Sequence, residues 1–300
     1  MLNSIQKVVI AGATGNLGSV VLNKLVDSGK FSVTVLRREG PTSSAVPNIN
    51  TVYADFNSVE SLAAALFGQD ALIVTLSAAA LHLQKNLIDA AIAAGIHRIL
   101  PSEFGSNLDN GNTRSLAVFA PKVQIQEYLI SKAVTTPLTY TFLYNSALLD
   151  FGLQSGFLFD MSKYKPTIFN GGEAVFSATT MPTVGDAVIS ILLHLEETKN
   201  RSVYIESVKV TQNELLGLAK QVAPEKPWQP HAASFSEVIS NADARLAQQI
   251  IDDQTIFPYV WRSIMDPNYG GNFRSTDNKL LGLKESSRQD IIEIIRKCIL

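Results

Sequence analysis

A glycine-rich segment between two regular patterns constrains the fold of this chain more than any other feature. Residues 7–11 form an apolar, β-branched run that is typical of a fully buried strand, and residues 16–28 carry apolar side chains at helical spacing. Glycine has no Cβ, so backbone N–H groups in such a turn can approach a pyrophosphate at the positive end of the helix. This context predicts a dinucleotide site; a simple tight turn is the alternative. The segment reads Gly12, Ala13, Thr14, Gly15, Asn16, Leu17 and Gly18.

The first half of the chain alternates short β-branched runs with longer helical runs, as parallel βαβ units do. We expect an α/β fold, namely a Rossmann-type doubly wound parallel sheet with a smaller, interleaved C-terminal substrate lobe. Residues 1–150 would form the nucleotide-binding domain and residues 151–300 the smaller lobe, with the chain crossing back between them. Asn57, Thr211 and Ser287 are the expected N-caps, each followed three positions later by an acidic residue. Further strands are expected at 31–36, 50–54, 71–76, 98–101 and 138–144, and helices at 58–67, 83–94, 121 to about 131, 184–195, from 211 onward, and 287–299.

Charge, cysteine content and hydropathy exclude several classes of protein. Lys and Arg number 25 against 27 Asp and Glu, so no basic surplus is available to neutralise a nucleic acid backbone. Cys298 is the only cysteine, which excludes a disulfide scaffold and a thiolate metal cluster and fits a reducing compartment. The longest nearly apolar run, 71–81, is about half the ~20 residues that a membrane helix needs. The N-terminal apolar run lacks the features of a secretory signal, so we expect a cytoplasmic protein with no membrane partner.

The end of the second expected strand indicates which dinucleotide binds. An acidic residue normally occupies this position in NAD sites, where it contacts the ribose 2′-hydroxyl. This chain has Arg37 and Arg38 instead, and two guanidinium groups suit a 2′-phosphate. We therefore expect NADPH as the cofactor. Glu39 follows directly, and a solvated basic turn is the alternative.

Several motifs along nearly the whole chain resemble one known family. The motifs are Gly12 to Gly18, Val-Leu-Arg-Arg-Glu at 35–39, Asp55, Gln84, Pro-Ser-Glu-Phe-Gly at 101–105, Lys122, Asn145, Thr-Val-Gly at 183–185, Thr-Gln-Asn-Glu at 211–214 and Asp-Asn-Lys-Leu-Leu-Gly at 277–282. They are similar to the isoflavone reductase and phenylcoumaran benzylic ether reductase family, which are atypical short-chain dehydrogenases of the NmrA-like group, and in particular to its fungal branch. The most specific of them is Pro-Ser-Glu-Phe-Gly.

This resemblance implies an NADPH-dependent reductase of aromatic or related secondary metabolites. It places the catalytic lysine at Lys122 and the 2′-phosphate contact at Arg38. Position 77 is Ser where plant members usually have Gly, and residues 146–149 replace large aromatic side chains. The resemblance therefore does not imply the shape of the substrate. The other cofactor-binding residues that it implies are Gly12, Thr14, Gly15, Asn16, Leu17, Gly18, Arg37, Asp55, Phe56, Thr75, Leu76, Ser77, Ser102 and Asn145, besides Lys122 itself.

Lys122 also has a chemical rationale of its own. It follows Pro121, in the first turn of an expected helix, where the positive helix end and burial both lower the pKa of an ammonium group. Such a shift favours proton transfer, whereas a solvated surface lysine is the alternative. Tyr128 and Lys132 match the Tyr-x-x-x-Lys pair of ordinary short-chain dehydrogenases, but they fall farther along the same helix.

The histidines and the aromatic residues of the second half are not expected to form a site of their own. His82, His97, His194 and His231 show no metal-ligand spacing, so no metal is expected. The aromatic residues at 228, 257, 259 and 261 are expected in the core or interface of the second lobe. A small aromatic molecule is the expected ligand beside NADPH; a non-catalytic dinucleotide sensor that binds a protein partner is the alternative. The substrate's identity and the oligomeric state cannot be read from these patterns.

Overall fold

A seven-stranded parallel sheet forms the centre of the computed structural model, which describes residues 4–40 and 45–299. The strand order is β10-β6-β5-β4-β1-β2-β3, and every neighbouring pair is parallel. The order reverses at β1, so the carboxyl ends of β1 and β4 flank the crevice where open α/β sheets bind ligands. The expected Rossmann-type sheet is confirmed. Its strands are β1 (Lys7–Ala11), β2 (Ser32–Arg38), β3 (Asn50–Ala54), β4 (Ala71–Val74), β5 (Arg98–Leu100), β6 (Thr139–Tyr144) and β10 (Arg201–Tyr204).

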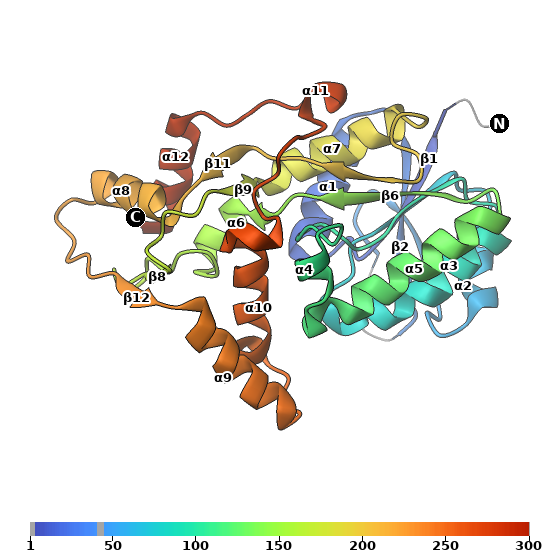
Figure 1. Cartoon of the computed structure of the whole chain (residues 1–300). Helices are drawn as coiled ribbons and strands as arrows, with labels where there is room; N and C mark the ends of the chain where they lie inside the picture. The colour runs from blue at the N-terminus through green and yellow to red at the C-terminus, as the bar shows by residue number, and fades with distance from the viewer. Residues whose placement is uncertain (1–3, 41–44, 300) are drawn as a thin grey trace.

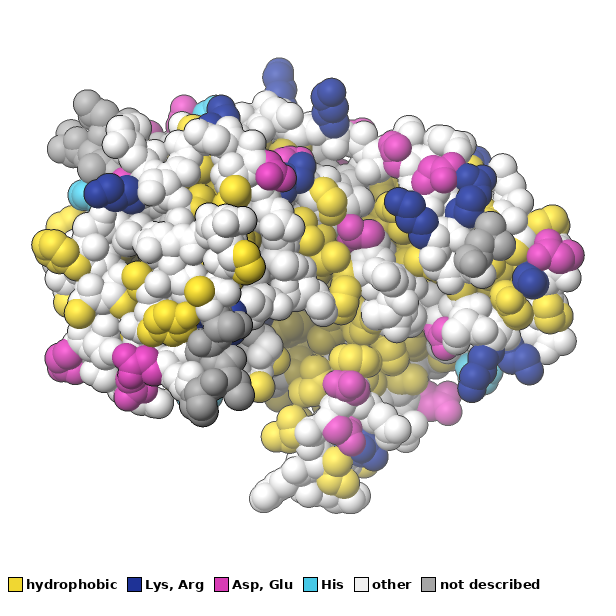
Figure 2. Space-filling view, turned by 180° about the vertical axis from the view of Figure 1, so that it is seen from behind, with side chains coloured by type: hydrophobic (Ala, Val, Ile, Leu, Met, Phe, Trp, Pro, Cys, Tyr) yellow, Lys and Arg dark blue, Asp and Glu magenta, His cyan; other side chains and the backbone are white. Residues whose placement is uncertain are grey.

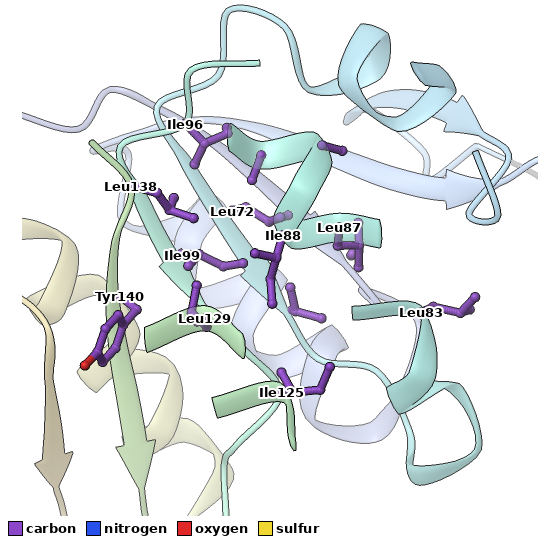
Figure 3. Close-up of a cluster of buried hydrophobic side chains, with 14 of the residues drawn as sticks. Leu72, Leu83, Leu87, Ile88, Ile96, Ile99, Ile125, Leu129, Leu138 and Tyr140 are labelled. Atoms are coloured by element: carbon purple, nitrogen blue, oxygen red, sulfur yellow. The ribbon is translucent and has the colours of Figure 1, made fainter. Parts of the chain in front are cut away.

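Helices cover both faces of this sheet (Figure 1). On one face lie α2 (Val59–Leu66), α3 (Gln84–Ala93) and α5 (Ala120–Thr135), whose apolar side chains meet those of the strands. Figure 3 shows part of this cluster, with Leu72 of β4 and Ile99 of β5 beside Ile88 of α3 and Leu129 of α5. On the other face lie α1 (Asn16–Asp27) and α7 (Met181–Leu193). Both faces of β4 are thus buried, which explains its wholly apolar sequence.

The second half of the chain gathers at one end of the sheet (Figure 1). It nevertheless contributes β10 and α7 to the main sheet and its cover. The division into domains at residue 150 stays a prediction. The remaining elements are η1 (Ala78–Leu83), α4 (Gly111–Arg114), η2 (Ala117–Phe119), β7 (Ala147–Leu148), α6 (Leu149–Gln154), β8 (Thr167–Phe169), β9 (Phe176–Thr179), β11 (Val208–Val210), α8 (Gln212–Val222), β12 (His231–Ala233), α9 (Phe235–Ala247), α10 (Asp253–Met265), η3 (Pro267–Tyr269), α11 (Asn278–Leu281) and α12 (Arg288–Ile299).

Capping contacts explain where several helices begin. The capping box of α8 is present, and Ser287 and Asp290 exchange the equivalent hydrogen bonds ahead of α12, so these two predictions are confirmed. The expected cap Asn57 is wrong, because the side chain of Ser58 accepts the hydrogen bond from the backbone N–H of Ser61. The helix expected at 184–195 begins at Met181, because the Thr180 side chain caps it.

Two further helix boundaries differ from expectation. The helix expected at 83–94 is preceded by a 3₁₀ segment, η1, and its α-helical part begins at Gln84. The helix expected to end near 131 continues to Thr135 and begins one residue early, at Ala120. Among the helices of residues 4–40 and 45–299, none combines the length and apolar character that crossing a membrane requires.

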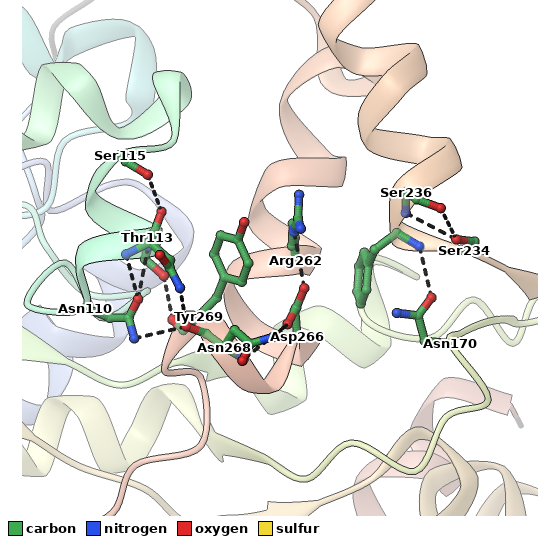
Figure 4. Close-up of polar contacts among 12 residues, drawn as sticks. Asn110, Thr113, Ser115, Asn170, Ser234, Ser236, Arg262, Asp266, Asn268 and Tyr269 are labelled. Atoms are coloured by element: carbon green, nitrogen blue, oxygen red, sulfur yellow. Dashed lines mark hydrogen bonds and ion pairs between the residues drawn. The ribbon is translucent and has the colours of Figure 1, made fainter.

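Polar contacts fix α4 and its N-cap, which precede α5, to η3, which follows α10. The side-chain amide of Asn110 donates to the backbone oxygen of Asn268 at 3.2 Å, and the Thr113 hydroxyl donates to that of Tyr269 at 2.5 Å (Figure 4). On α10, Arg262 bonds Asp266 at 3.2 Å and lies over the Tyr269 ring at 4.5 Å. The segment that leads to Lys122 is therefore attached to the second half of the chain.

Candidate active site

The glycine segment turns tightly at the carboxyl end of β1. Gly12 has a φ of +92°, and a Cβ there would lie 2.5 Å from the backbone oxygen of Thr75. A Cβ on Gly18 would lie 2.1 Å from the oxygen of Gly12, whereas one on Gly15 would meet that oxygen at an ordinary 3.5 Å. Gly12 and Gly18 thus permit close packing of the backbone. Gly15 instead leaves space at the start of α1, where no side chain caps the helix and no acidic residue occupies the first turn.

This arrangement fits the pyrophosphate of a dinucleotide. The first N–H groups of a helix have no partner within the helix, and its N-terminus attracts anions. Side chains at Gly12 and Gly18 would collide with backbone, and one at Gly15 would fill the open space. The loop therefore has the backbone approach that phosphate binding requires.

Two adjoining cavities lie beside this loop, over the ends of β2 and β3. The first, of about 410 Å³, extends from the glycine segment to Arg37 and Arg38 and includes Thr14, Phe56, Thr75, Leu76 and Ser77. The second, of about 560 Å³, shares Arg38, Phe56 and Ser77 and adds Asp55, Asn57 and His82. Arg37 is half-buried and Arg38 is exposed. A guanidinium group lines both cavities, as a bound 2′-phosphate would need.

A third cavity, of about 350 Å³, continues from the other side of the same loop. Gly15, Asn16 and Leu17 line it together with Thr75, Leu76 and Ser77. Its far wall consists of Ser102, Glu103, Phe104 and Lys122. The cavity therefore brings the start of α1, the ends of β4 and β5 and the start of α5 to one place.

Hydrogen bonds hold the strand ends around this third cavity. The Thr75 hydroxyl donates to the backbone oxygen of Ala11 at 3.1 Å, and the Ser102 hydroxyl donates to that of Leu76 at 2.7 Å. The Ser102 N–H in turn donates to the side-chain oxygen of Gln84 at 2.8 Å. Hydrogen bonds thus connect the end of β1 to that of β4, and the end of β4 to that of β5.

Lys122 lies in the first turn of α5 with its side chain 21% exposed. Its Nζ donates a hydrogen bond of 2.5 Å to the backbone oxygen of Glu103 and lies 4.0 Å from the Glu103 carboxylate. Burial lowers the pKa of Lys122, and the neighbouring Glu103 charge opposes this shift. A lysine with a lowered pKa at a cavity wall releases its proton more readily than a solvated lysine does.

A separate apolar cavity of about 570 Å³ lies between α6 and α10. Its wall contains Phe151, Phe157, Phe257 and Trp261. Figure 2 shows hydrophobic side chains gathered in a hollow above the projecting part of the molecule, which consists of α9 and the start of α10. Phe104 lines both this cavity and the one that contains Lys122, so the two cavities meet at this residue. Its backbone has a φ of +28°, which is unusual for a residue with a side chain.

The aromatic residues of the second half do more than fill a core. Trp261 packs on Phe157 and Phe169, and the Trp261 indole N–H bonds the Phe157 backbone oxygen at 2.7 Å. The same tryptophan and Phe257 nonetheless line the apolar cavity, which their expected role in the core did not include. Tyr259 and Trp228 match that expectation better, since the first is buried and the second packs against Tyr164.

Most residues implied by the family resemblance line one of these cavities, but two do not. Gly18 lies beneath Gly12, and Asn145 is fully buried, with its Nδ2 donating to the Ser146 backbone oxygen at 3.1 Å. Glu103 and Phe104 were missed as site residues, although both belong to the Pro-Ser-Glu-Phe-Gly motif. An acidic residue three positions after a buried strand was the available signal.

The competing Tyr128 and Lys132 pair lies on the outer side of α5, against α3. The Tyr128 hydroxyl donates to Asp89 at 2.5 Å, and Lys132 pairs with the same carboxylate at 3.3 Å. Neither residue lines any of the four cavities described above. In the part of the chain that the structure describes, no group of three or more His, Cys, Asp or Glu side chains could hold a metal ion.

Comparisons with known proteins show the family of this chain. The NmrA-like family model matches residues 4–260. The oxidoreductase aprR of Aspergillus flavus is 32% identical over 303 residues, covering 97% of this chain and 99% of its own. An isoflavone reductase homologue of Nicotiana glauca is 29% identical over 146 residues, which cover 45% of this chain and 46% of its own. The leucoanthocyanidin reductase of Vitis vinifera, solved as a complex with NADPH, shares the fold with a TM-score of 0.79 at 19% identity, over 98% of this chain and 99% of its own.

Proposed function

The chain belongs to the NmrA-like family and is an oxidoreductase of its isoflavone-reductase-like kind, and from this premise we propose that it is an NADPH-dependent reductase of a small aromatic molecule. The observation that carries the proposal is the third cavity, in which Lys122 faces the start of α1 across the ends of β4 and β5. Residues proposed to bind the dinucleotide and a candidate proton donor thus line the same cavity.

The cofactor would lie along the strand ends, across the first and third cavities. Thr14, Gly15, Asn16 and Leu17 would hold the pyrophosphate, in the turn whose close packing Gly12 and Gly18 permit. Arg37 and Arg38 would contact the 2′-phosphate, and Asp55 and Phe56 would border the adenosine. Thr75, Leu76, Ser77 and Ser102 would line the nicotinamide end. Asn145, which is buried outside these cavities, stays a prediction from the family resemblance.

Lys122 would hold the proton that the reaction consumes. When bound, NADPH supplies the hydride. The lowered pKa of Lys122 makes release of its proton to a substrate atom easier than from a solvated lysine. The hydrogen bond to the Glu103 backbone oxygen keeps Nζ at the cavity wall while the proton is transferred.

The apolar cavity beside Phe104 would receive the substrate. Five aromatic residues in its wall, Phe104 among them, suit a planar, apolar ligand, which would gain free energy by leaving water and by stacking. Ser106 and Ser146 line the same wall, but their hydroxyl groups already bond Ser263 and the backbone oxygen of Gly271, so the wall would hold its ligand mainly by apolar contact.

A binding assay and a turnover assay test this proposal. Calorimetry should show that NADPH binds to the full chain, and a screen of aromatic metabolites should find one whose reduction oxidises NADPH. Binding of NADPH without turnover of any compound would favour the dinucleotide sensor. Absence of NADPH binding would overturn the proposal altogether.

A further inference from the structure

The side chain of Glu103 is buried in an unusual way. It is 1% exposed, and neither carboxylate oxygen has a hydrogen-bond partner among residues 4–40 and 45–299. Burial of a charged group without partners is costly, and a carboxylate in a merely structural position normally accepts hydrogen bonds. The nearest cation is the Lys122 ammonium group, whose Nζ lies 4.0 Å away.

A local turn directs two oxygen acceptors of one residue toward the same ammonium group. The Glu103 N–H donates to the Pro101 backbone oxygen at 2.7 Å, and Phe104 follows with its positive φ. The Glu103 backbone oxygen then accepts the Lys122 hydrogen bond at 2.5 Å while the carboxylate lies within ion-pair distance. Strained backbone of this kind persists only where the surroundings hold it, and it recurs at functional sites.

The other groups that face Glu103 do not replace Lys122. Gln126 of α5 already accepts from Arg114 and donates to the Tyr144 hydroxyl. Asp109, in the loop after β5, accepts from Tyr144 and Tyr204. Burial raises the pKa of Glu103 to about 7. The Lys122 charge, the polar side chain of Gln126 and the Arg114 charge oppose that rise, while the Asp109 charge adds to it. The carboxyl and the ammonium lie close enough that the protonation of each affects that of the other.

We propose that Glu103 is the positioning residue of Lys122. Its backbone oxygen holds Nζ, and its buried carboxylate sets the pH at which the ammonium loses its proton. The inference rests on the proposed role of Lys122, and it deepens that role by assigning a partner. A neutral residue at 103 would leave the ammonium without a counter-charge, so Lys122 would lose its proton at lower pH.

The test compares Glu103→Gln with the wild-type chain by two independent measurements. The first follows the NMR signal of the Lys122 Cε in ¹³C-lysine-labelled protein across pH, with Lys122→Arg identifying the signal. The second is the pH profile of kcat for an aromatic substrate. We expect the Lys122 titration to move down by about one pH unit or more, since an opposite charge at 4 to 6 Å shifts a pKa by ~1 to 3 units. The kcat profile should move in the same direction, with KM nearly unchanged.

Two further variants make the outcome decisive. Glu127→Gln removes an exposed carboxylate from the same helix and should leave both measurements unchanged. Glu103→Asp keeps the charge and should restore most of the Lys122 titration, which covers the case in which Glu103→Gln fails to fold. An unchanged Lys122 titration in folded Glu103→Gln would overturn the inference, even if the rate fell. A shifted titration without reduction of any substrate would support the pairing and count against the proposed function.

Discussion

The backbone oxygen of Gly12 packs against Gly18, only 2.1 Å from the point where a Cβ on Gly18 would lie. This contact fixes the first turn of α1 against the end of β1. Gly15, three residues away, makes no such contact and has an extended backbone with a φ of −76°. Two glycines of one motif therefore serve packing, and the third serves the ligand.

The first prediction separates these roles. Gly15→Val should weaken NADPH binding at least ~10-fold, because its side chain would occupy the space of the pyrophosphate. The fold should lose only about 1 kcal/mol, as expected for a less favourable N-cap. Gly18→Ala should instead destabilise the fold by ~1 to 3 kcal/mol or more through overpacking. Calorimetry and urea unfolding of both variants measure this; normal NADPH binding by Gly15→Val would show that the phosphates lie elsewhere.

The second prediction concerns the choice of cofactor. Arg38→Ala should lower the affinity for NADPH ~10-fold and leave that for NADH unchanged, because a charge-assisted contact to the 2′-phosphate is worth ~1.5 kcal/mol or more. Arg296→Ala, which removes an exposed arginine on α12, is the matched control. Calorimetric titration with both dinucleotides gives the four affinities. An equal loss of affinity for NADPH and NADH would mean that Arg38 does not contact the 2′-phosphate.

The third prediction distinguishes two lysine assignments on α5. Lys122→Ala should reduce kcat by ~10² to 10⁴-fold, the usual effect of losing a general acid, with NADPH binding largely kept. Tyr128→Phe should remain active, because the Tyr128 hydroxyl bonds Asp89 away from the cavities. Steady-state kinetics of both variants on one substrate provide the measurement. The reverse pattern would indicate the ordinary Tyr-x-x-x-Lys mechanism.

The fourth prediction concerns the apolar cavity. Phe257→Ala should raise KM for an aromatic substrate about 10-fold, since apolar area in the cavity wall is lost, and should change kcat less. Phe67→Ala removes a phenyl ring of similar size that is 80% exposed at the end of α2, so it should change neither constant. If KM of Phe257→Ala equals that of the wild type, the substrate binds elsewhere.

The sequence predicted the parts of the site that depend on neighbouring residues. Local patterns placed these residues because each lies at the end or the start of a regular element. The glycine segment follows β1, Arg37 and Arg38 end β2, and Lys122 lies in the first turn of α5. The apolar cavity was not predictable in this way, because Phe157 and Phe257 are far apart in the sequence and meet at 4.9 Å only through packing of α10.

Local sequence patterns did not predict the contacts of buried polar groups either. Arg98 was expected as the first residue of a strand, and the structure confirms that position. Its guanidinium is also buried, and donates to Thr139 and Thr141 of β6 and to Thr198 and the Leu195 backbone oxygen, beyond α7. Glu103 likewise gains its significance only where α5 places Lys122 beside it.

The last prediction uses Glu103 to relate protonation to stability. Burial raises the pKa of this carboxyl from an ordinary 4.5 to about 7. Between these two pH values the folded chain keeps the proton at Glu103 and the unfolded chain has lost it, so the free energy of unfolding falls as the pH rises. Below 4.5 both states are protonated, and this contribution no longer changes.

Glu103→Gln cannot take part in that titration. The free energy of unfolding of the variant, relative to that of the wild type, should therefore rise by roughly 1 to 3 kcal/mol between pH 4.5 and 7. Urea unfolding at four or five pH values measures the difference. For Glu127→Gln, whose carboxylate is exposed and pairs with Arg114, the corresponding difference should stay within about 0.5 kcal/mol across this range. A difference for Glu103→Gln that is equally flat would mean that the Glu103 carboxyl is ionised throughout, and Lys122 would then face a permanent negative charge.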